Sequence, residues 1–331
     1  MKKMNISLFI CVIILSLFGL LMVYSSSNVW AEYKFSDPYK YVKNQGLFLI
    51  IGIIIMYTVS KIDYKKYYKY CNKIFITCLT LIILVLFIGS ERNGSKSWFG
   101  IGSFGIQPSE FMKLAMIIFT SKYLCNNKND IKNILPILFI TFIIFILIML
   151  QPDFGTGVIL VMGVIGLLFI SGVNLNFFLK IGILGLIGII ILILAAPYRL
   201  KRILSFLNPW SDPLGSGFQI IQSLYAIGPG GLFGFGLGAS RQKHFYLPEP
   251  QTDFIFSIIS EELGIVGILI VSSLFCFIIY QSIKISLKCN DLFGKYLSFG
   301  IIFLLSFQSI LNLSVVIGLI PVTGVILRGI L

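Results

Sequence analysis

Long runs of apolar residues, separated by short polar stretches, fill the chain from near its first residue to its last. A helix needs roughly 20 residues to cross the ~30 Å hydrocarbon core of a bilayer, and these runs approach or reach that length. The pattern predicts an all-α, polytopic membrane protein with about nine transmembrane helices in a single membrane domain, residues 1–331. The expected spans are 5–26, 42–60, 73–90, 108–124, 134–150, 155–171, 177–195, 252–280 and 294–320.

The composition supports a membrane protein. Hydrophobic residues make up 57% of the 331 residues and charged residues only 12%, whereas charged residues are about a quarter of an average soluble domain. Lys2 and Lys3 precede the first apolar run, as in a signal peptide. That run is longer than a signal core and no A-x-A-like site follows it, so we expect it to remain as a helix.

Basic residues cluster in every second connection and so predict the orientation. Residues 61–73 carry five lysines, and residues 121–133 and 281–295 carry three each. Short basic loops stay in the cytoplasm, which places the N-terminus inside. The net charge of +13 is then a topology signal and an attraction to anionic membrane lipid, and requires no nucleic acid. None of the six cysteines falls on an outer loop and no CxxC spacing occurs, so neither a disulfide framework nor a zinc site is supported.

The connection at 196–251, on the predicted outer side, is much longer than the others and rich in aromatic residues. Loops of this length are usually functional, and so much apolar area argues against disorder. Its glycine-rich stretch, 228–240, matches a dinucleotide-binding spacing only formally, so we expect close backbone packing in a half-buried or re-entrant segment. The lone His244 cannot build a metal site. Five cations lie here against the positive-inside bias and suggest an anionic ligand: Arg199, Lys201, Arg202, Arg241 and Lys243.

The stretch "YLPEPQTDFIFSIISEELG", 246–264, holds four of the 13 acidic residues. Thr252 or Asp253 stands where a helix N-cap belongs, and a cap alone would explain Asp253. At 100° per residue, Asp253, Ser257, Ser260 and Glu261 share a face, and Glu262 points the opposite way. Glu261 would lie about 12 Å deeper than Asp253. A carboxylate there costs ~2.5–3.5 kcal/mol, so it must face a partner or a wet cavity, and we expect this face to be a cavity wall.

Other polar residues near the membrane are compatible with the same cavity. Glu110 and Lys113 follow Pro108 at i,i+3 spacing and can pair on one helix face, although an interfacial pair that only neutralises itself explains them equally well. Asp153, in the turn "QPDFGTG", is a candidate helix cap, and Trp98 a candidate interfacial anchor.

Together these motifs resemble the SEDS family (shape, elongation, division and sporulation) of RodA/FtsW/SpoVE-like cell-wall glycosyltransferases. The resemblance covers nearly the whole chain, and its "EPQTDF" form, with Gln251, looks most like the division and sporulation branch. The motifs are "FGLLMVYSSS" (18–27), "QPSEFMKL" (107–114), "QPDFGTG" (151–157), the stretch 206–240, the stretch 246–264 and "GLIPVTG" (318–324).

The resemblance implies a ten-helix fold in the bacterial plasma membrane and a peptidoglycan polymerase that uses lipid II. Asp253 matches the family's essential aspartate, the general base that deprotonates the acceptor GlcNAc 4-hydroxyl during inverting transfer. A monofunctional class B penicillin-binding protein is the implied partner. No cofactor is certain; a divalent cation is a candidate. By this resemblance, Glu110, Lys113 and Asp153 match positions that line the central cavity. Our own candidates for the cations that bind the pyrophosphate are Lys96, Arg202 and Lys243, and Trp98 and Gln251 are further candidate substrate-binding residues.

Two features depart from the family pattern. One basic residue, Lys96, precedes Trp98 where members usually have two, and the chain ends "PVTGVILRGIL" without a serine- and glycine-rich segment or a tenth span. We therefore keep three hypotheses: a lipid II polymerase, a flippase that moves a lipid-linked precursor along Ser257, Ser260 and Glu261, and an inactive scaffold that docks a penicillin-binding protein.

Overall fold

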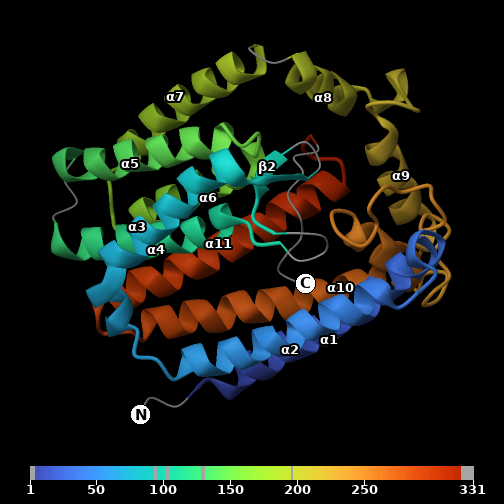
Figure 1. Cartoon of the computed structure of the whole chain (residues 1–331), viewed down its shortest axis with the longest axis horizontal. Coiled ribbons are helices and arrows are strands. Elements are labelled where there is room, and N and C mark those ends of the chain that lie inside the picture. The colour runs from blue at the N-terminus through green and yellow to red at the C-terminus, as the bar shows by residue number, and fades with distance from the viewer. Residues whose placement is uncertain (1–3, 93–94, 101–104, 128–130, 195–196, 322–331) are drawn as a thin grey trace. The chain divides into compact units, whose positions relative to one another are not determined.

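The computed structural model describes residues 4–92, 95–100, 105–127, 131–194 and 197–321, and this part of the chain is mostly helical (Figure 1). A short hairpin of β1 (Ser90–Arg92) and β2 (Ser95–Trp98) follows the third helix. The α-helices are α1 (Ile6–Phe35), α2 (Lys40–Ser60), α3 (Lys65–Ile88), α4 (Pro108–Asn126), α5 (Ile131–Met149), α6 (Phe154–Ile170), α7 (Leu175–Leu194), α8 (Pro197–Leu207), α9 (Phe218–Ile227), α10 (Ile255–Leu287) and α11 (Leu292–Val316).

Each of the nine expected spans coincides with one of these helices, which confirms the all-α membrane fold. Six described helices are long and apolar enough to cross a bilayer, namely α1, α2, α3, α5, α10 and α11, while α6 and the apolar part of α7 are shorter. The remaining span, α4, carries Glu110, Lys113 and Lys122 within its 19 residues. Two of these charged residues, Glu110 and Lys113, are candidate site residues from the sequence, and Lys122 belongs to the basic connection 121–133.

Local sequence fixes several helix ends. The Asn5 side chain accepts the Leu8 N–H at 3.1 Å and begins α1, and Ser36 ends that helix in the left-handed region at φ 53°. Pro108 occupies the first turn of α4, where its missing N–H costs nothing.

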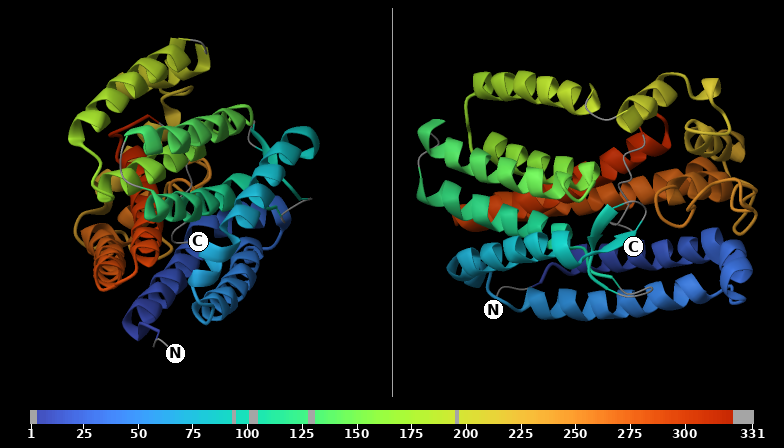
Figure 2. Two further views of the ribbon diagram at one scale, coloured as in Figure 1. Left: turned by 90° about the vertical axis from the view of Figure 1, so that its left-hand side faces the viewer. Right: turned by 45° about the horizontal axis from the view of Figure 1, so that its top comes forward.

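The described chain divides into two compact units. Unit 1 comprises Met1–Lys61, Gly185–Gln281 and Gln308–Leu331, and unit 2 comprises Ile62–Leu184 and Ser282–Phe307. In unit 1, α1 and α2 lie side by side (Figure 2). Its apolar core joins α1, the first part of α10 and the end of α11 through residues such as Met22, Ile258 and Val316. The expected single membrane domain stays a prediction.

In unit 2, α4, α6 and the first part of α11 approach closely through small residues. A Cβ atom at Gly166 would lie 2.5 Å from the ring of Phe303, and one at Gly163 would lie 3.3 Å from Ile117 and Leu304. Small residues of this kind let membrane helices pack closely.

The outer segment, which we define as residues 196–251, has more structure than a simple loop. It contains α8, α9 and two 3-10 turns, Pro209–Ser211 and Gly228–Gly230. Leu204 and Leu207 of α8 are exposed. The departure expected at the C-terminus concerns residues 322–331, which lie outside the described residues.

Candidate active site

Asp253 lies where the outer segment returns to α10. The helix begins at Ile255, so Asp253 stands one residue before the position of an N-cap, and its capping role stays a prediction. Its side chain is partly exposed. The Nδ2 atom of Asn312, a residue of α11 that is 1% exposed, donates a hydrogen bond to the main-chain carbonyl of Asp253 at 3.1 Å. The backbone of the candidate base is therefore held by a different helix.

A second set of polar contacts, about one helical turn beyond Asp253, connects α9, α10 and α11. The Ser223 hydroxyl of α9 donates to the Val316 carbonyl of α11 at 2.6 Å and lies 2.8 Å from the Ser257 hydroxyl of α10. All three groups are buried, where a satisfied hydrogen bond contributes about 1 kcal/mol and a broken one costs more. The start of α10, next to Asp253, is thus anchored to α9 and α11.

Gln251 is 7% exposed, and its Oε1 atom has no hydrogen-bond partner among the described residues. A buried amide oxygen without a partner costs ~1–3 kcal/mol. A bound polar ligand is one way in which such an oxygen can be satisfied. The position two residues before Asp253 makes Gln251 a candidate for substrate contact, as the family resemblance implies.

The helical wheel of α10 needs a correction. It pointed Glu262 away from the face that holds Asp253 and made Glu261 part of a cavity wall, but both carboxylates bind residues 240–243 of the outer segment. The wheel gives only the Cβ direction, whereas a glutamate has three rotatable bonds and the outer segment folds closely onto α10. Glu261 faces a protein partner, which was the other alternative for a carboxylate at that depth.

The cations proposed for pyrophosphate differ in their surroundings. Lys243 is 3% exposed, and its Nζ atom donates to the carbonyl oxygens of Gly238 at 2.6 Å and Ser25 at 3.2 Å. Lys96 is exposed, and its Nζ donates to the Phe87 carbonyl at 3.2 Å. The side chain of Arg202 lies outside the described residues. The pyrophosphate role of all three stays a prediction.

One exposed cation of the outer segment was noted in the sequence but given no role. The Arg241 guanidinium stacks over the ring of Phe235, with 4.9 Å between its Cζ atom and the ring centroid. Stacking restricts the guanidinium and leaves its N–H groups accessible. Sequence spacing gives no signal for this pair, because the two residues meet only through the fold.

In unit 2 the expected ion pair is present. The Lys113 Nζ atom lies 3.0 Å from a Glu110 carboxylate oxygen, with side-chain exposures of 2% and 29%. Asp153 caps α6 as predicted, through Oδ1 and the Thr156 N–H at 3.1 Å, and its Oδ2 accepts from Gln107 Nε2 at 2.6 Å. The sequence did not single out Gln107, which brings the start of α4 and the start of α6 together.

Trp98 ends β2, and its main-chain carbonyl accepts the Ser90 hydroxyl at 3.0 Å. Its substrate role stays a prediction. Unit 1 and unit 2 each hold part of the predicted site. Asp253, Lys243 and Gln251 belong to unit 1, and Lys96, Trp98, Glu110, Lys113 and Asp153 belong to unit 2.

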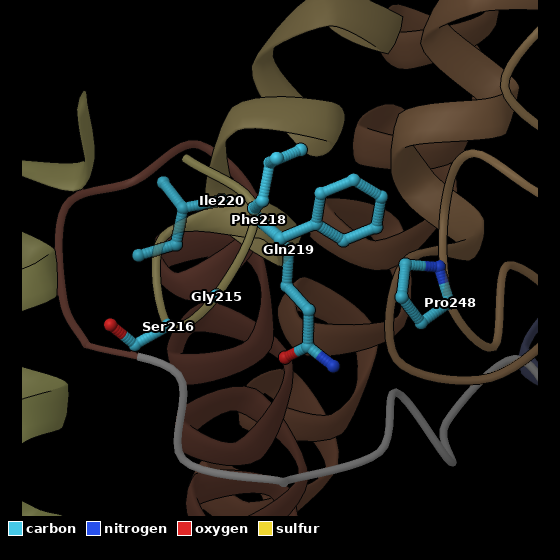
Figure 3. Close-up of a pocket in the computed structure, with 7 residues that line it drawn as sticks. Gly215, Ser216, Phe218, Gln219, Ile220 and Pro248 are labelled. Carbon is cyan, nitrogen blue, oxygen red and sulfur yellow. The ribbon is translucent and has the colours of Figure 1, made fainter. Parts of the chain in front are cut away.

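A pocket of about 300 Å³ opens in the outer segment beside Pro248 (Figure 3). In this view the Gln219 side chain runs between Ser216 and Pro248. The lining residues are Leu214, Gly215, Ser216, Phe218, Gln219, Ile220 and Pro248. Within the described ranges, no group of three or more His, Cys, Asp or Glu side chains could hold a metal ion. The candidate divalent cation stays untested.

Comparison with known proteins decides the family. The FtsW/RodA/SpoVE family model, described as "Cell cycle protein", matches residues 5–329. The chain belongs to the FtsW/RodA/SpoVE family. The resemblance inferred from the sequence motifs is therefore confirmed, and this family member is a multi-pass bacterial membrane protein.

Two curated members of the FtsW/RodA/SpoVE family illustrate the similarity. Stage V sporulation protein E of Bacillus subtilis (strain 168) is 50% identical over 98% of this chain and 91% of that protein. The probable peptidoglycan glycosyltransferase FtsW of Geobacter sp. (strain M18) is 37% identical over 95% of this chain and 88% of that protein.

A solved structure agrees with this family assignment. It is a chain from "Structural coordination of polymerization and crosslinking by a peptidoglycan synthase complex", with a TM-score of 0.80 and 26% identity over 99% of this chain and 91% of that one.

Proposed function

We propose that this family member is a peptidoglycan glycosyltransferase that polymerises lipid II, with Asp253 as the general base. The name of the FtsW relative and the peptidoglycan synthase complex support the reaction class. One observation carries the assignment to Asp253. Its partly exposed side chain follows a buried Gln251 whose amide oxygen has no partner in the described structure, and its backbone is held by Asn312.

In the proposed reaction, the Asp253 carboxylate takes the proton of the acceptor GlcNAc 4-hydroxyl as that oxygen attacks the anomeric carbon of the donor MurNAc. The bond from this carbon to the lipid diphosphate breaks, the diphosphate leaves with the electron pair, and the anomeric configuration inverts. A single base on the attacking side suffices, because diphosphate needs no proton to leave once cations stabilise its charge. Asn312 contributes by limiting the motion of the base.

Gln251 supports the same arrangement. An amide oxygen accepts hydrogen bonds and would be satisfied by a hydroxyl or N-acetyl N–H group of a bound sugar. Because binding would remove the cost of burying this oxygen alone, the site is built for a polar ligand. We assign Gln251 to holding a sugar beside Asp253.

The diphosphate requires cations on the same side of the membrane. Arginine binds phosphate oxygens in a bidentate manner and is well suited to this role. The basic connections of the predicted cytoplasmic side support an active site that faces outward. Lys96 and Arg202 remain the candidate diphosphate-binding cations. Lys243 could bind the diphosphate only if its ammonium gave up its hydrogen bonds to the carbonyls of Gly238 and Ser25.

A class B penicillin-binding protein is the proposed partner. The solved relative belongs to a complex that coordinates polymerization and crosslinking. A polymerase that acts alone would leave the new strand uncrosslinked, so a crosslinking enzyme is the expected neighbour of this chain in the membrane.

The transport hypothesis has less support than the sequence suggested. It depended on a polar stripe facing a cavity, but Ser257 contacts Ser223, and Glu261 binds main-chain N–H groups of the outer segment. These groups are therefore engaged within the protein. No described contact favours transport over polymerisation.

Polymerisation of lipid II by the purified 331-residue chain tests the proposal. Glycan strands should form with the wild-type chain and with Asp37→Asn, which removes a partly exposed carboxylate paired with Lys43, and should disappear with Asp253→Ala and Asp253→Asn. Lipid translocation that survives Asp253→Ala, without any glycan product from the wild type, would favour the transporter. A wild type inactive in both assays would favour the scaffold.

A further inference from the structure

Two consecutive buried carboxylates of α10 remain unexplained by the proposed chemistry. Glu261 is 2% exposed and Glu262 is 0% exposed. A buried carboxylate is tolerated only when charge or hydrogen bonds stabilise it. The surroundings of each one therefore indicate what it does.

Glu261 binds the outer segment through three donors. One carboxylate oxygen accepts the Arg241 N–H at 2.9 Å, and the other accepts the Ser240 hydroxyl at 2.5 Å and the Gln242 N–H at 3.4 Å. Successive main-chain N–H groups that converge on one anion form a nest, a favourable site for negative charge. Here the anion is a side chain of the same protein, so the nest holds the segment to α10.

Glu262 binds the next part of the same segment and joins it to α1. Its carboxylate accepts the Ser25 hydroxyl at 2.5 Å and the Ser240 N–H at 3.3 Å, and lies 3.7 Å from the Lys243 ammonium. That ammonium also donates to the carbonyls of Ser25 and Gly238. Removing the carboxylate would leave a buried cation without its counterion, which is the costly way to break a buried pair.

The main chain of the same two residues holds a second part of the outer segment. Gly264 interrupts α10 at φ 63° and ψ −154°, so the carbonyl oxygens of Glu261 and Glu262 lose their usual helical donors. They accept instead the N–H groups of Phe235 at 3.0 Å and Gly236 at 2.9 Å.

The N–H groups that follow the break in α10 also find hydrogen-bond partners in the outer segment. The N–H groups of Ile265 and Val266 donate to the carbonyls of Gly231 at 3.0 Å and Leu232 at 3.1 Å. The glycine-rich stretch thus completes the hydrogen bonding of an interrupted helix, which irregular backbone within a membrane protein requires. This arrangement confirms the expected close packing of the glycines.

We propose that Glu261 and Glu262 are positioning residues for glycosyl transfer. With their carbonyls and carboxylates they fix residues 235–243 on α10, eight and nine residues beyond Asp253. Only a short stretch of chain leads from Lys243 to Asp253. Leu247, within this stretch, is 2% exposed, and its N–H donates to the Gln242 carbonyl at 3.0 Å. Glu261 and Glu262 therefore determine the position of the outer segment, including its cations, relative to Asp253. This inference rests on the proposed function.

The test combines hydrogen exchange with kinetics on the full chain. Glu261→Gln keeps the size of the side chain and removes its charge, and Glu32→Gln makes the same change at an exposed carboxylate of α1. In Glu261→Gln, exchange of the amides of residues 240–242 should be at least about tenfold faster, and kcat for lipid II polymerisation should fall roughly 10–100-fold with little change in KM. Glu32→Gln should match the wild type in both.

A second pair of variants controls for loss of stability caused by changing Glu262. Glu262→Gln alone leaves the Lys243 charge buried, whereas Glu262→Gln with Lys243→Met removes both charges, so the double variant should be the more stable of the two. It should nevertheless show fast exchange and low kcat. Ser240→Ala, which removes one donor to Glu261, should give an intermediate effect in both measurements.

Three results would overturn the inference. Exchange at 240–242 that is unchanged in Glu261→Gln would mean that the carboxylate does not hold the segment. Fast exchange with normal kcat would mean that holding it is irrelevant to the reaction. An equal loss of activity in Glu32→Gln would remove the specificity of the effect. A wild-type chain that makes no glycan overturns the proposed function itself, and is recognised before any variant is compared.

Discussion

The side-chain amide of Asn312 holds the main-chain carbonyl of Asp253 at 3.1 Å, across 59 residues of sequence. The contact joins α11 to the residue that precedes α10 by two positions. It restrains the backbone of the residue that we propose as the general base.

Asn312→Ala should lower kcat roughly 10–100-fold, because a base displaced by even 1 Å loses much of its effect. KM for lipid II should change much less, since the substrate contacts remain. Ser314→Ala, two residues along α11, is the control, because that hydroxyl bonds only to the Ile310 carbonyl of its own helix. Steady-state polymerisation kinetics measure kcat and KM for both variants. A normal kcat in Asn312→Ala would show that Asn312 does not position Asp253.

Gln251→Met should separate stability from function. Methionine has a similar volume and no buried oxygen to leave without a partner, so the free energy of unfolding should stay equal or rise by up to ~1 kcal/mol. Polymerisation should fall at least about tenfold, because the sugar loses a hydrogen-bond acceptor. Thermal unfolding and kinetics on the same preparation provide both values. Undiminished activity would exclude Gln251 from the substrate site.

Gly264→Ala should destabilise the protein by ~2–4 kcal/mol, through the positive φ angle and through crowding. A Cβ atom at this position would lie 2.5 Å from the Gly234 nitrogen. Gly52→Ala in α2 is the matched control: no atom lies within 4 Å of its Cβ position, and alanine favours a helix by ~0.5–1 kcal/mol over glycine. Thermal unfolding in detergent should therefore shift in opposite directions for the two variants, and equal shifts would refute the strained break.

The Glu110–Lys113 pair should behave as a coupled unit. Glu110→Gln should cost ~1–3 kcal/mol, below the full cost of breaking a buried pair because Glu110 is 29% exposed. Adding Lys113→Met should recover part of that loss, since it removes the buried ammonium that loses the Glu110 carboxylate. A double-mutant cycle on unfolding free energies measures the coupling, and strictly additive effects would show that the pair does not interact.

Much of the fold and part of the site could be predicted from local pattern. Among the described residues, apolar runs located the helices that match the expected spans, i,i+3 spacing gave the Glu110–Lys113 pair, and a turn motif gave the Asp153 cap. These features depend on residues that are near in sequence, so periodicity and helix geometry are enough to find them.

The contacts around Asp253 could not be predicted in this way. Asn312 and Ser223 reach the start of α10 from distant positions, and Lys243, a candidate pyrophosphate cation, is buried. The helical wheel failed at Glu262 because it gives only the Cβ direction, whereas the glutamate side chain is flexible and the outer segment folds closely onto α10. Gly264 breaks α10, and another segment completes it.

The sequence by itself determined that this chain is a helical membrane protein of the FtsW/RodA/SpoVE family, since hydrophobic length, charge asymmetry and ordered motifs are properties of the linear chain. Only the tertiary structure decided which polar groups hold one another and which stay open to a ligand. The physical reason is that a buried charge or peptide group must find a partner, and the choice of partner depends on which distant segments the fold brings within hydrogen-bond distance.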